Sequence, residues 1–129
     1  MSTRTWTPLD TPNAPPPAGA YSRCIRAGSL LFISGQVPRD FETGALLGAE
    51  LEAQTLGVIA NLRRVLEGAG AGLEDVVSVT AYLADIGDWD AFNRIYREAF
   101  EPPYPTRTTV GAALHDVLVE LSAVAVVPE

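Results

Sequence analysis

Two segments alternate hydrophobic and polar residues with the period of two that is typical of half-buried strands. In residues 75–83 the expected core face consists of Val77, Val79, Ala81 and Leu83, and the other face of Val76, Ser78, Thr80 and Tyr82. In residues 117–127 the expected core face consists of Val117, Val119, Leu121, Ala123 and Ala125, with Glu120 and Ser122 opposite. Both segments therefore predict strands that place one face on a core.

Four further segments are predicted to be strands. Residues 30–35 are almost entirely apolar, which is typical of a strand that is buried on both faces. Residues 21–25 read as a short strand, and residues 3–7 as a short edge strand ahead of a proline-rich rim. In residues 105–113, Arg107, Thr109 and Gly111 are expected on one face and Thr108, Val110 and Ala112 on the other.

Two segments have the spacing of three and four residues that predicts amphipathic helices. The first covers residues 49–68 and stops at Gly68 and Gly70; the second covers residues 89–100, is capped by Asp88 and ends at Pro102-Pro103. The expected buried residues of the first helix are Leu51, Thr55, Ile59, Leu62 and Leu66, widened by Leu56 and Val65, and those of the second are Phe92, Ile95, Tyr96 and Ala99.

The predicted order is β-β-β-α-β-α-β-β, which favours an α+β fold with a mixed sheet and both helices on one face. Strands that are apolar on both sides leave the second face of such a sheet uncovered. In a chain of 129 residues, another copy of the chain is the expected cover, so we predict a closed homo-oligomer.

The amino-acid composition limits the number of domains and the classes of function that the chain can have. With 47% hydrophobic residues and 129 positions, the chain is expected to form one folded domain, residues 1–129. The net charge is −7 and all nine cations are arginines, so a lysine Schiff base is excluded and the scattered arginines argue against nucleic-acid binding. One cysteine and one histidine exclude an internal disulfide and a Cys/His zinc site. No signal peptide or membrane-spanning run is present, so a cytoplasmic protein is expected.

Arg107 and Glu120 are the first candidates for chemistry. A guanidinium on a strand face that is otherwise lined by small groups is suited to bind a carboxylate with two hydrogen bonds, although an ordinary surface arginine fits the pattern equally well. Glu120 interrupts an apolar run, where an unpaired charge is costly. The two residues form either a structural ion pair on neighbouring strands or a site in which Arg107 anchors an acid and Glu120 handles a water.

Three other residues have weaker signals. His115 is better explained as a turn residue beside Asp116 than as a catalyst. Cys24 lies near two arginines that could lower its pKa, but a half-buried strand cysteine is the simpler interpretation. Trp89 opens the second helix and is either a core anchor or a pocket wall.

The chain resembles the reactive-intermediate deaminase family, also called the YjgF or L-PSP family, over nearly its whole length. The matching segments are Gly19-Ala-Tyr21, Ile33-Ser-Gly-Gln-Val-Pro38, Thr43-Gly44, Asn61, Asp75-Val-Val, Asn93-Arg-Ile-Tyr96 with Phe100, Pro105-Thr-Arg107 and Val119-Glu-Leu121 with the following Ala-Val-Ala. The Ser-Gly-Gln and Pro-Thr-Arg segments are the most specific of these in their order and spacing.

This resemblance implies a chorismate-mutase-like fold that assembles as a homotrimeric barrel with sites between subunits. It implies hydrolysis of reactive 2-imino or 2-enamino acids to 2-keto acids and ammonia, without a metal or organic cofactor. The implied residues are Arg107 for the substrate carboxylate, Glu120 for the water and Tyr21 as the pocket tyrosine. Ser34, Gly35, Trp89 and Asn93 are implied to line the substrate site, which Thr109 also borders.

Two departures from the family pattern concern the substrate. Thr109 stands where the family often has a cysteine, and the turn from Leu114 to Val117 is about two residues shorter than usual. The physiological imino acid and the pathway are therefore left open. A non-catalytic trimer that senses a small carboxylic acid is the main alternative, and an endoribonuclease or translation inhibitor is the third.

Overall fold

The computed structural model describes residues 3–128, which form six strands, two α-helices and two short 3-10 helices. Their order confirms the predicted β-β-β-α-β-α-β-β sequence of elements. The bounds are β1 (Trp6–Leu9), β2 (Cys24–Ala27), β3 (Leu30–Gln36), α1 (Leu51–Gly68), η1 (Leu73–Asp75), β4 (Val76–Leu83), η2 (Ile86–Asp88), α2 (Trp89–Ala99), β5 (Thr106–Gly111) and β6 (Val119–Val126).

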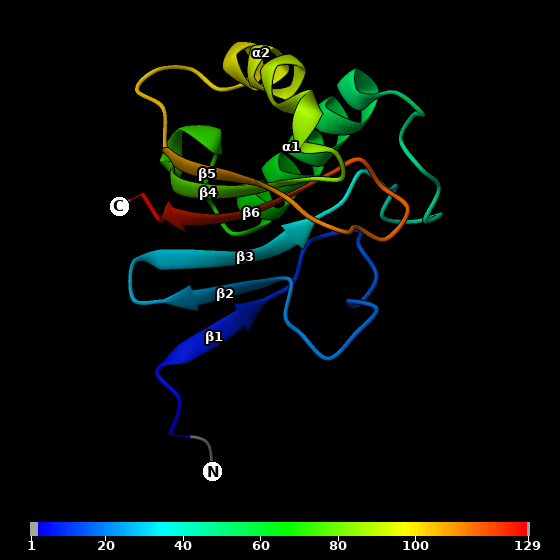
Figure 1. The fold of residues 1–129 in the computed structure, drawn as a ribbon. Helices are drawn as coiled ribbons and strands as arrows, with labels where there is room; N and C mark the ends of the chain where they lie inside the picture. Colours follow the sequence, from blue (N-terminus) through cyan, green and yellow to red (C-terminus); the bar gives the residue numbers. More distant parts are fainter. Residues whose placement is uncertain (1–2, 129) are drawn as a thin grey trace.

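All strands belong to one six-stranded sheet with the order β1-β2-β3-β6-β4-β5 (Figure 1). Only β4 and β5 pair in parallel; the other four pairs are antiparallel. The crossover through α2 makes that parallel pairing feasible, because parallel neighbours need a long connection. The last strand, β6, therefore lies between β3 and β4, and β5 forms one edge of the sheet.

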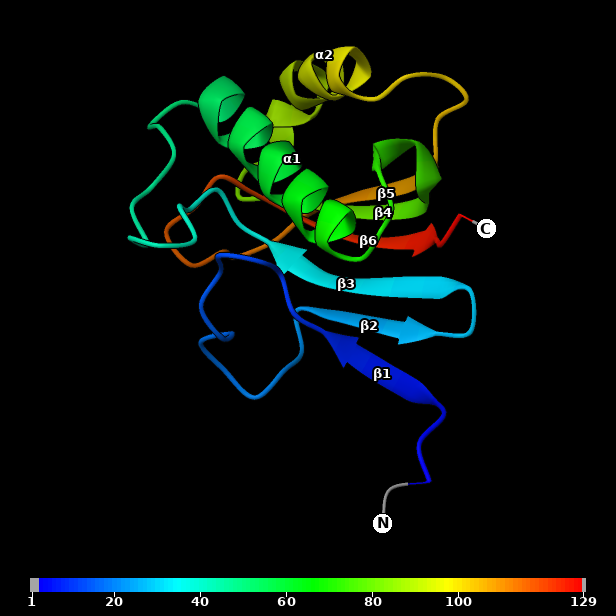
Figure 2. The same ribbon diagram turned by 180° about the vertical axis from the view of Figure 1, so that it is seen from behind.

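Both α-helices cover the same face of the sheet, as the sequence predicts; in the view from behind, α1 crosses in front of the strands and α2 lies above it (Figure 2). Val58, Leu62 and Leu66 of α1 and Phe92 of α2 are completely buried there. Leu56, which the sequence places on the edge of the buried stripe, is instead 48% exposed. It lies beyond the width of the helix that the sheet can cover.

The core faces of β4 and β6 follow the alternation with one correction. Val119, Leu121, Ala123 and Ala125 are buried as predicted. In β4, however, Val76 is buried and Val77 is exposed, the reverse of the expected arrangement. The register between β4 and β6 shifts between Val76 and Ser78, and this irregularity inverts the facing of the residues before it.

The N-terminal strands begin later than predicted. The edge strand is residues 6–9 rather than 3–7, and it tolerates Pro8 because an edge strand has one side without hydrogen-bond partners. The second strand begins at Cys24, so Tyr21 lies in the bend that precedes it rather than in the strand.

Two buried amides of α1 hold the loops that surround the candidate site. Asn61 donates from Nδ2 to the carbonyls of Val37 and Arg39, at 2.9 and 2.8 Å. Gln54 donates to the carbonyl of Gly48 at 3.1 Å and accepts from the backbone N–H of Leu118 at 2.8 Å. These bonds fix the chain just after β3 and just before β6.

The start of α2 differs in detail from the prediction. Asp88 occupies the N-cap position but its side chain makes no capping hydrogen bond. The acid that caps is Asp85, which accepts from the backbone N–H of Gly87 at 2.8 Å and begins the 3-10 helix that leads into α2. The one-turn 3-10 helix moves the capping interaction upstream.

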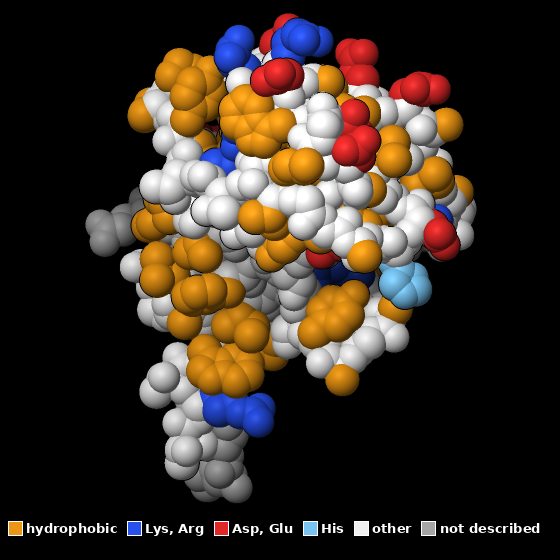
Figure 3. All heavy atoms as spheres, in the orientation of Figure 1, with side chains coloured by type: hydrophobic (Ala, Val, Ile, Leu, Met, Phe, Trp, Pro, Cys, Tyr) orange, Lys and Arg blue, Asp and Glu red, His pale blue; other side chains and the backbone are white. Residues whose placement is uncertain are grey.

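The second face of the sheet is uncovered in a single chain. Leu30 and Phe32 of β3, predicted to be buried on both sides, are 37% and 45% exposed, while Leu31 and Ile33 are buried under the helices. Hydrophobic side chains gather on this face over β2 and β3, beside a hollow (Figure 3). The hollow is a cavity of about 330 Å³ that includes Phe32, Ser34, Thr80, Ser122 and Val124.

Candidate functional site

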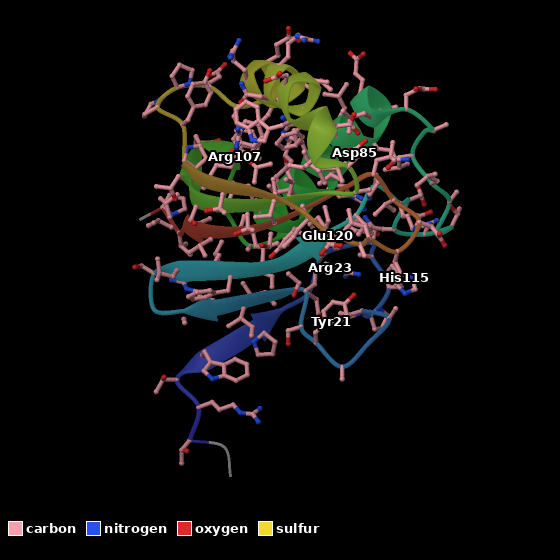
Figure 4. All side chains as sticks on the ribbon, viewed as in Figure 1. Tyr21, Arg23, Asp85, Arg107, His115 and Glu120 are labelled. Carbon is pink, nitrogen blue, oxygen red and sulfur yellow. The ribbon has the colours of Figure 1, made fainter. Side chains whose placement is uncertain are left out.

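Arg107 lies on the helix-covered face at the β5 edge. It is the register partner of the buried Val79 in the parallel β4–β5 pair, and neighbours in register share a face. This confirms the facing predicted from the alternation: residues 107 and 109 are half-buried, and residues 106, 108 and 110 are exposed. Figure 4 shows Arg107 between β5 and α2.

An amide and three aromatic rings of α2 hold the guanidinium of Arg107. Its Nη2 donates to Oδ1 of Asn93 at 2.9 Å. Its central carbon lies 4.7 Å from the ring centre of Tyr96 and 5.4 Å from those of Trp89 and Phe92. Spacings of three and four residues bring these side chains to one face of the helix. Within residues 3–128 no carboxylate forms an ion pair with Arg107, so its charge is positioned but not neutralised.

A cavity of about 340 Å³ opens beside this guanidinium. It is lined by Asn93, Tyr96, Arg97, Tyr104, Pro105 and Arg107. Tyr96, Arg97 and Tyr104 are candidates for the site that the sequence motifs do not single out as such. The spacing of Asn93, Tyr96 and Arg97, three and four residues apart on one helix, was the available signal.

Tyr96 and Thr109 carry buried hydroxyl groups near Arg107. Neither Oη of Tyr96 nor Oγ1 of Thr109 has a hydrogen-bond partner within the described chain. Burial raises the pKa of Tyr96 to about 12, against a smaller lowering effect of Arg107. Tyr96 therefore stays protonated at neutral pH and can act as a hydrogen-bond donor.

Of the two interpretations of Trp89 that the sequence left open, the core anchor is wrong. It is 40% exposed, so it is no core anchor, and it does not line the cavity beside Arg107. Its ring instead packs against the guanidinium from the first turn of α2. Its contribution is to the placement of Arg107 through a cation–π contact.

Glu120 lies on the uncovered face. It is the register partner of Tyr82, while the buried Leu121 and Val119 on either side point to the helices. Burial raises the pKa of the Glu120 carboxyl, and no other group contributes to the shift. This agrees with the expectation that an acid within the apolar run would be partly desolvated.

Gly35 makes the space that Glu120 occupies. A Cβ atom at position 35 would overlap Oε2 of Glu120 and lie 2.9 Å from its Cδ. The register of β3 with β6 shifts between Ile33 and Gln36, which places Ser34 and Gly35 at an irregular point opposite β6. The hydroxyl of Ser34 donates to the carbonyl of Ser22 at 2.6 Å, so it ties the Tyr21 segment to β3.

Tyr21 lies at the same end of the sheet as Glu120. Figure 4 shows Tyr21, Arg23 and Glu120 grouped where β3 ends, on the side away from α2. Tyr21 is 55% exposed, and its backbone N–H donates to the carbonyl of Gly19 at 2.9 Å. The tyrosine, the glutamate and the Ser34-Gly35 segment therefore form a second group, separate from that of Arg107.

The suggested ion pair between Arg107 and Glu120 is wrong. The strands β5 and β6 are not neighbours, because β4 lies between them, and the two side chains are on opposite faces of the sheet. Sequence order suggested adjacency, but β5 pairs with β4 instead. The candidate residues of each chain thus form two separate groups, which are called the Arg107 half-site (Arg107, Asn93, Trp89 and Thr109) and the Glu120 half-site (Glu120, Gly35, Ser34 and Tyr21).

The remaining sequence candidates have structural explanations. His115 is exposed in the turn where Asp116 adopts a φ of 59°, as expected for a turn residue. Cys24 is buried in β2, and burial raises its pKa, which is opposite to the effect suggested for its neighbouring arginines. Within residues 3–128, no three His, Cys, Asp or Glu side chains are arranged to hold a metal ion.

Comparison with known proteins identifies the family. A family model described as endoribonuclease L-PSP matches residues 11–127. The chain belongs to the endoribonuclease L-PSP family. This confirms the resemblance seen in the sequence, since the reactive-intermediate deaminases and the L-PSP proteins are one family under two names.

Three relatives show how far the similarity extends. A RutC family protein of Pyrococcus horikoshii is 43% identical over 117 residues, covering 89% of this chain and 93% of the relative. A 2-iminobutanoate/2-iminopropanoate deaminase of Dermatophagoides farinae is 32% identical over 105 residues, which cover 81% of this chain and 82% of the relative. The crystal structure of a putative endoribonuclease L-PSP from Entamoeba histolytica is 40% identical in sequence and superposes with a TM-score of 0.85. The match covers 94% of this chain and 98% of that protein. The L-PSP fold of this chain is therefore shown. In the described part of the chain, neither helix has the length and hydrophobicity needed to cross a membrane.

Proposed function

We propose that this L-PSP protein hydrolyses 2-imino acids, and their 2-enamino tautomers, to 2-keto acids and ammonia. The observation that carries the proposal is that the guanidinium of Arg107 is held in place but has no acidic partner within residues 3–128. A guanidinium held by an amide and three aromatic rings, with no acidic partner in the described chain, is prepared to bind a carboxylate from outside. The imine deaminase name of a relative with 32% identity supports the choice of a 2-imino acid as that carboxylate.

The proposed site is shared between two copies of the chain. In an imino acid the carboxylate is bonded directly to the imine carbon, so the group that handles water must lie a few ångströms from the carboxylate anchor. Arg107 and Glu120 of one chain are on opposite faces of the sheet and cannot both reach such a substrate. The Arg107 half-site of one copy facing the Glu120 half-site of the next satisfies the requirement.

A ring of copies follows from this arrangement. Two different patches that meet form a heterologous interface, which closes into a ring when the rotation allows. The exposed Phe32 and the hollow beside Ser34 and Ser122 provide the uncovered face that such a neighbour would cover. We propose a homotrimer, the closed ring that the family resemblance implies.

The chemistry requires orientation and one proton relay. Arg107 binds the carboxylate, and Glu120 of the neighbouring copy accepts a proton from water as the water oxygen bonds to the imine carbon. Return of this proton to the nitrogen gives a carbinolamine. The proton of its hydroxyl group then passes to the nitrogen through the same carboxyl group, the C–N bond breaks, and ammonia leaves as the C=O bond forms. Burial raises the pKa of Glu120 from its ordinary value toward neutral pH, which favours a carboxyl group that both accepts and returns a proton.

The test is the rate of keto-acid formation from 2-iminopropanoate generated in situ by an amino-acid oxidase. We expect acceleration over spontaneous hydrolysis, with Arg107→Ala and Glu120→Gln each reducing kcat/KM by about 10²-fold or more. Binding of 2-oxobutanoate without any acceleration would favour the carboxylate sensor. RNA cleavage that persists in Arg107→Ala protein free of nuclease would favour the endoribonuclease, against the charge of −7.

A further inference from the structure

The cavity beside Arg107 is lined by hydrogen-bond donors and by no acid. Two guanidinium groups, those of Arg97 and Arg107, line the same 340 Å³ space together with Asn93, Tyr96 and Tyr104. The chain has 16 acidic residues and a net charge of −7, yet none of the acids lines this cavity. One carboxylate would need only one of the two arginines.

Arg97 is free to bind a ligand. It is exposed on α2, four residues after Asn93, so the two side chains lie on one face of the helix. Within residues 3–128 it has neither an ion pair nor a hydrogen bond. Its position in the last turn of α2 complements the helix dipole, but that interaction does not require it to line the cavity.

Tyr96 gives an independent indication of a missing acceptor. The residue is 3% exposed and lines the cavity, and its hydroxyl has no partner within the described chain. A buried hydroxyl without a hydrogen bond is costly. An oxygen of a bound anion would satisfy it.

We propose that the site is selective for dicarboxylic imino acids, the imines of acidic amino acids. The carboxylate next to the imine carbon binds Arg107, and the second carboxylate binds Arg97, with the hydroxyl of Tyr96 as a further donor. A cavity of about 340 Å³ has room for a four- or five-carbon dicarboxylate. This inference rests on the proposed function and adds the substrate class to it.

The test compares two imines of the same shape, those of aspartate and asparagine, each generated in situ by an amino-acid oxidase. They differ only in a carboxylate oxygen replaced by an amide nitrogen. We expect kcat/KM to be about tenfold higher for the aspartate imine, because a charged hydrogen bond is lost with the amide. Arg97→Gln should reduce this ratio to near one. Arg94→Gln, which removes the same charge from the same helix outside the cavity, should leave the ratio unchanged.

A wild-type ratio near one, or equal effects of Arg97→Gln and Arg94→Gln, would overturn the proposal. Hydrolysis of 2-iminopropanoate reports separately on the proposed function, so activity without a preference refutes only the substrate class. If no imine is hydrolysed, calorimetric titration with 2-oxosuccinate and its amide 2-oxosuccinamate, the keto acids that correspond to the same two imines, decides. Tighter binding of the diacid that Arg97→Gln abolishes supports a dicarboxylate site, and equal binding overturns it.

Discussion

Replacement of Gly35 by alanine tests whether the position of Glu120 sets the rate. The backbone of Gly35 is outside the left-handed region, so alanine is compatible with its conformation. The new Cβ would overlap Oε2 of Glu120 and lie 2.9 Å from Cδ and 3.2 Å from Cγ. The carboxylate must therefore rotate away, whereas the backbone can stay in place.

The expected effects on stability and on activity differ widely. The atoms that must move belong to the end of a flexible side chain, so the free energy of unfolding should change by about 1 kcal/mol or less. A catalytic group displaced by about 1 Å can lower a rate by about 10²-fold, and we expect kcat for 2-iminopropanoate to fall by about that factor. Urea denaturation and steady-state kinetics measure the two quantities on the same preparation.

The same substitution in a Glu120→Gln background separates two mechanisms. If Gly35→Ala acts by displacing the carboxylate that handles water, it should reduce kcat little further once that carboxylate has been replaced. An equal reduction in both backgrounds would mean that the methyl group merely narrows the cleft. Full activity of Gly35→Ala in the wild-type background would refute the assigned position of the glutamate.

Three other predictions concern single side chains. Asn93→Ala removes the 2.9 Å hydrogen bond to Arg107. It should raise KM about tenfold with a smaller change in kcat, because a hydrogen bond to a charged group contributes about 1.5 kcal/mol. An unchanged KM would show that the aromatic rings alone hold the guanidinium in place. Burial raises the pKa of Glu120 in the folded chain above its ordinary value of 4.5. At a pH between 4.5 and this raised pKa, the folded chain binds more protons than the unfolded chain, so the free energy of unfolding falls as pH rises. Glu120→Gln should therefore be more stable than wild type at neutral pH and lose this advantage below about pH 4 in urea titrations; an advantage independent of pH would contradict the raised pKa. The buried Cys24, whose pKa is raised, should react with a thiol reagent far more slowly in the folded than in the unfolded protein, and equal rates would contradict its burial.

The order of elements could be predicted because each depends on local periodicity. The stripes of α1 and α2 and the alternation of β6 led directly to the observed elements. The facing of Val76 and Val77 could not be predicted in this way. A register shift between strands depends on the partner strand, and it inverts the alternation without any change in the pattern of residues.

The two half-sites illustrate a second limit. Alternation placed Arg107 and Glu120 each on the correct face of its own strand, but it cannot relate the faces of two strands without the strand order. The ion-pair alternative required the strands of Arg107 and Glu120 to be neighbours, as strands that follow each other in sequence are in about two-thirds of cases. Here β4 lies between β5 and β6, and its registers with these two strands place Arg107 and Glu120 on opposite faces. The contacts of Tyr96 and Arg97 with the cavity depend on the same tertiary arrangement.

The shared site is tested most directly by mixing two inactive variants. Arg107→Ala keeps an intact Glu120 half-site, and Glu120→Gln keeps an intact Arg107 half-site. If each site combines half-sites from two copies in a closed ring, random mixing in equal amounts restores about one quarter of the sites, whatever the size of the ring. Co-expressed variants should therefore recover about one quarter of wild-type kcat with an unchanged KM. Activity that stays at the level of the separate variants, in assemblies shown to contain both chains, would contradict a site formed between copies.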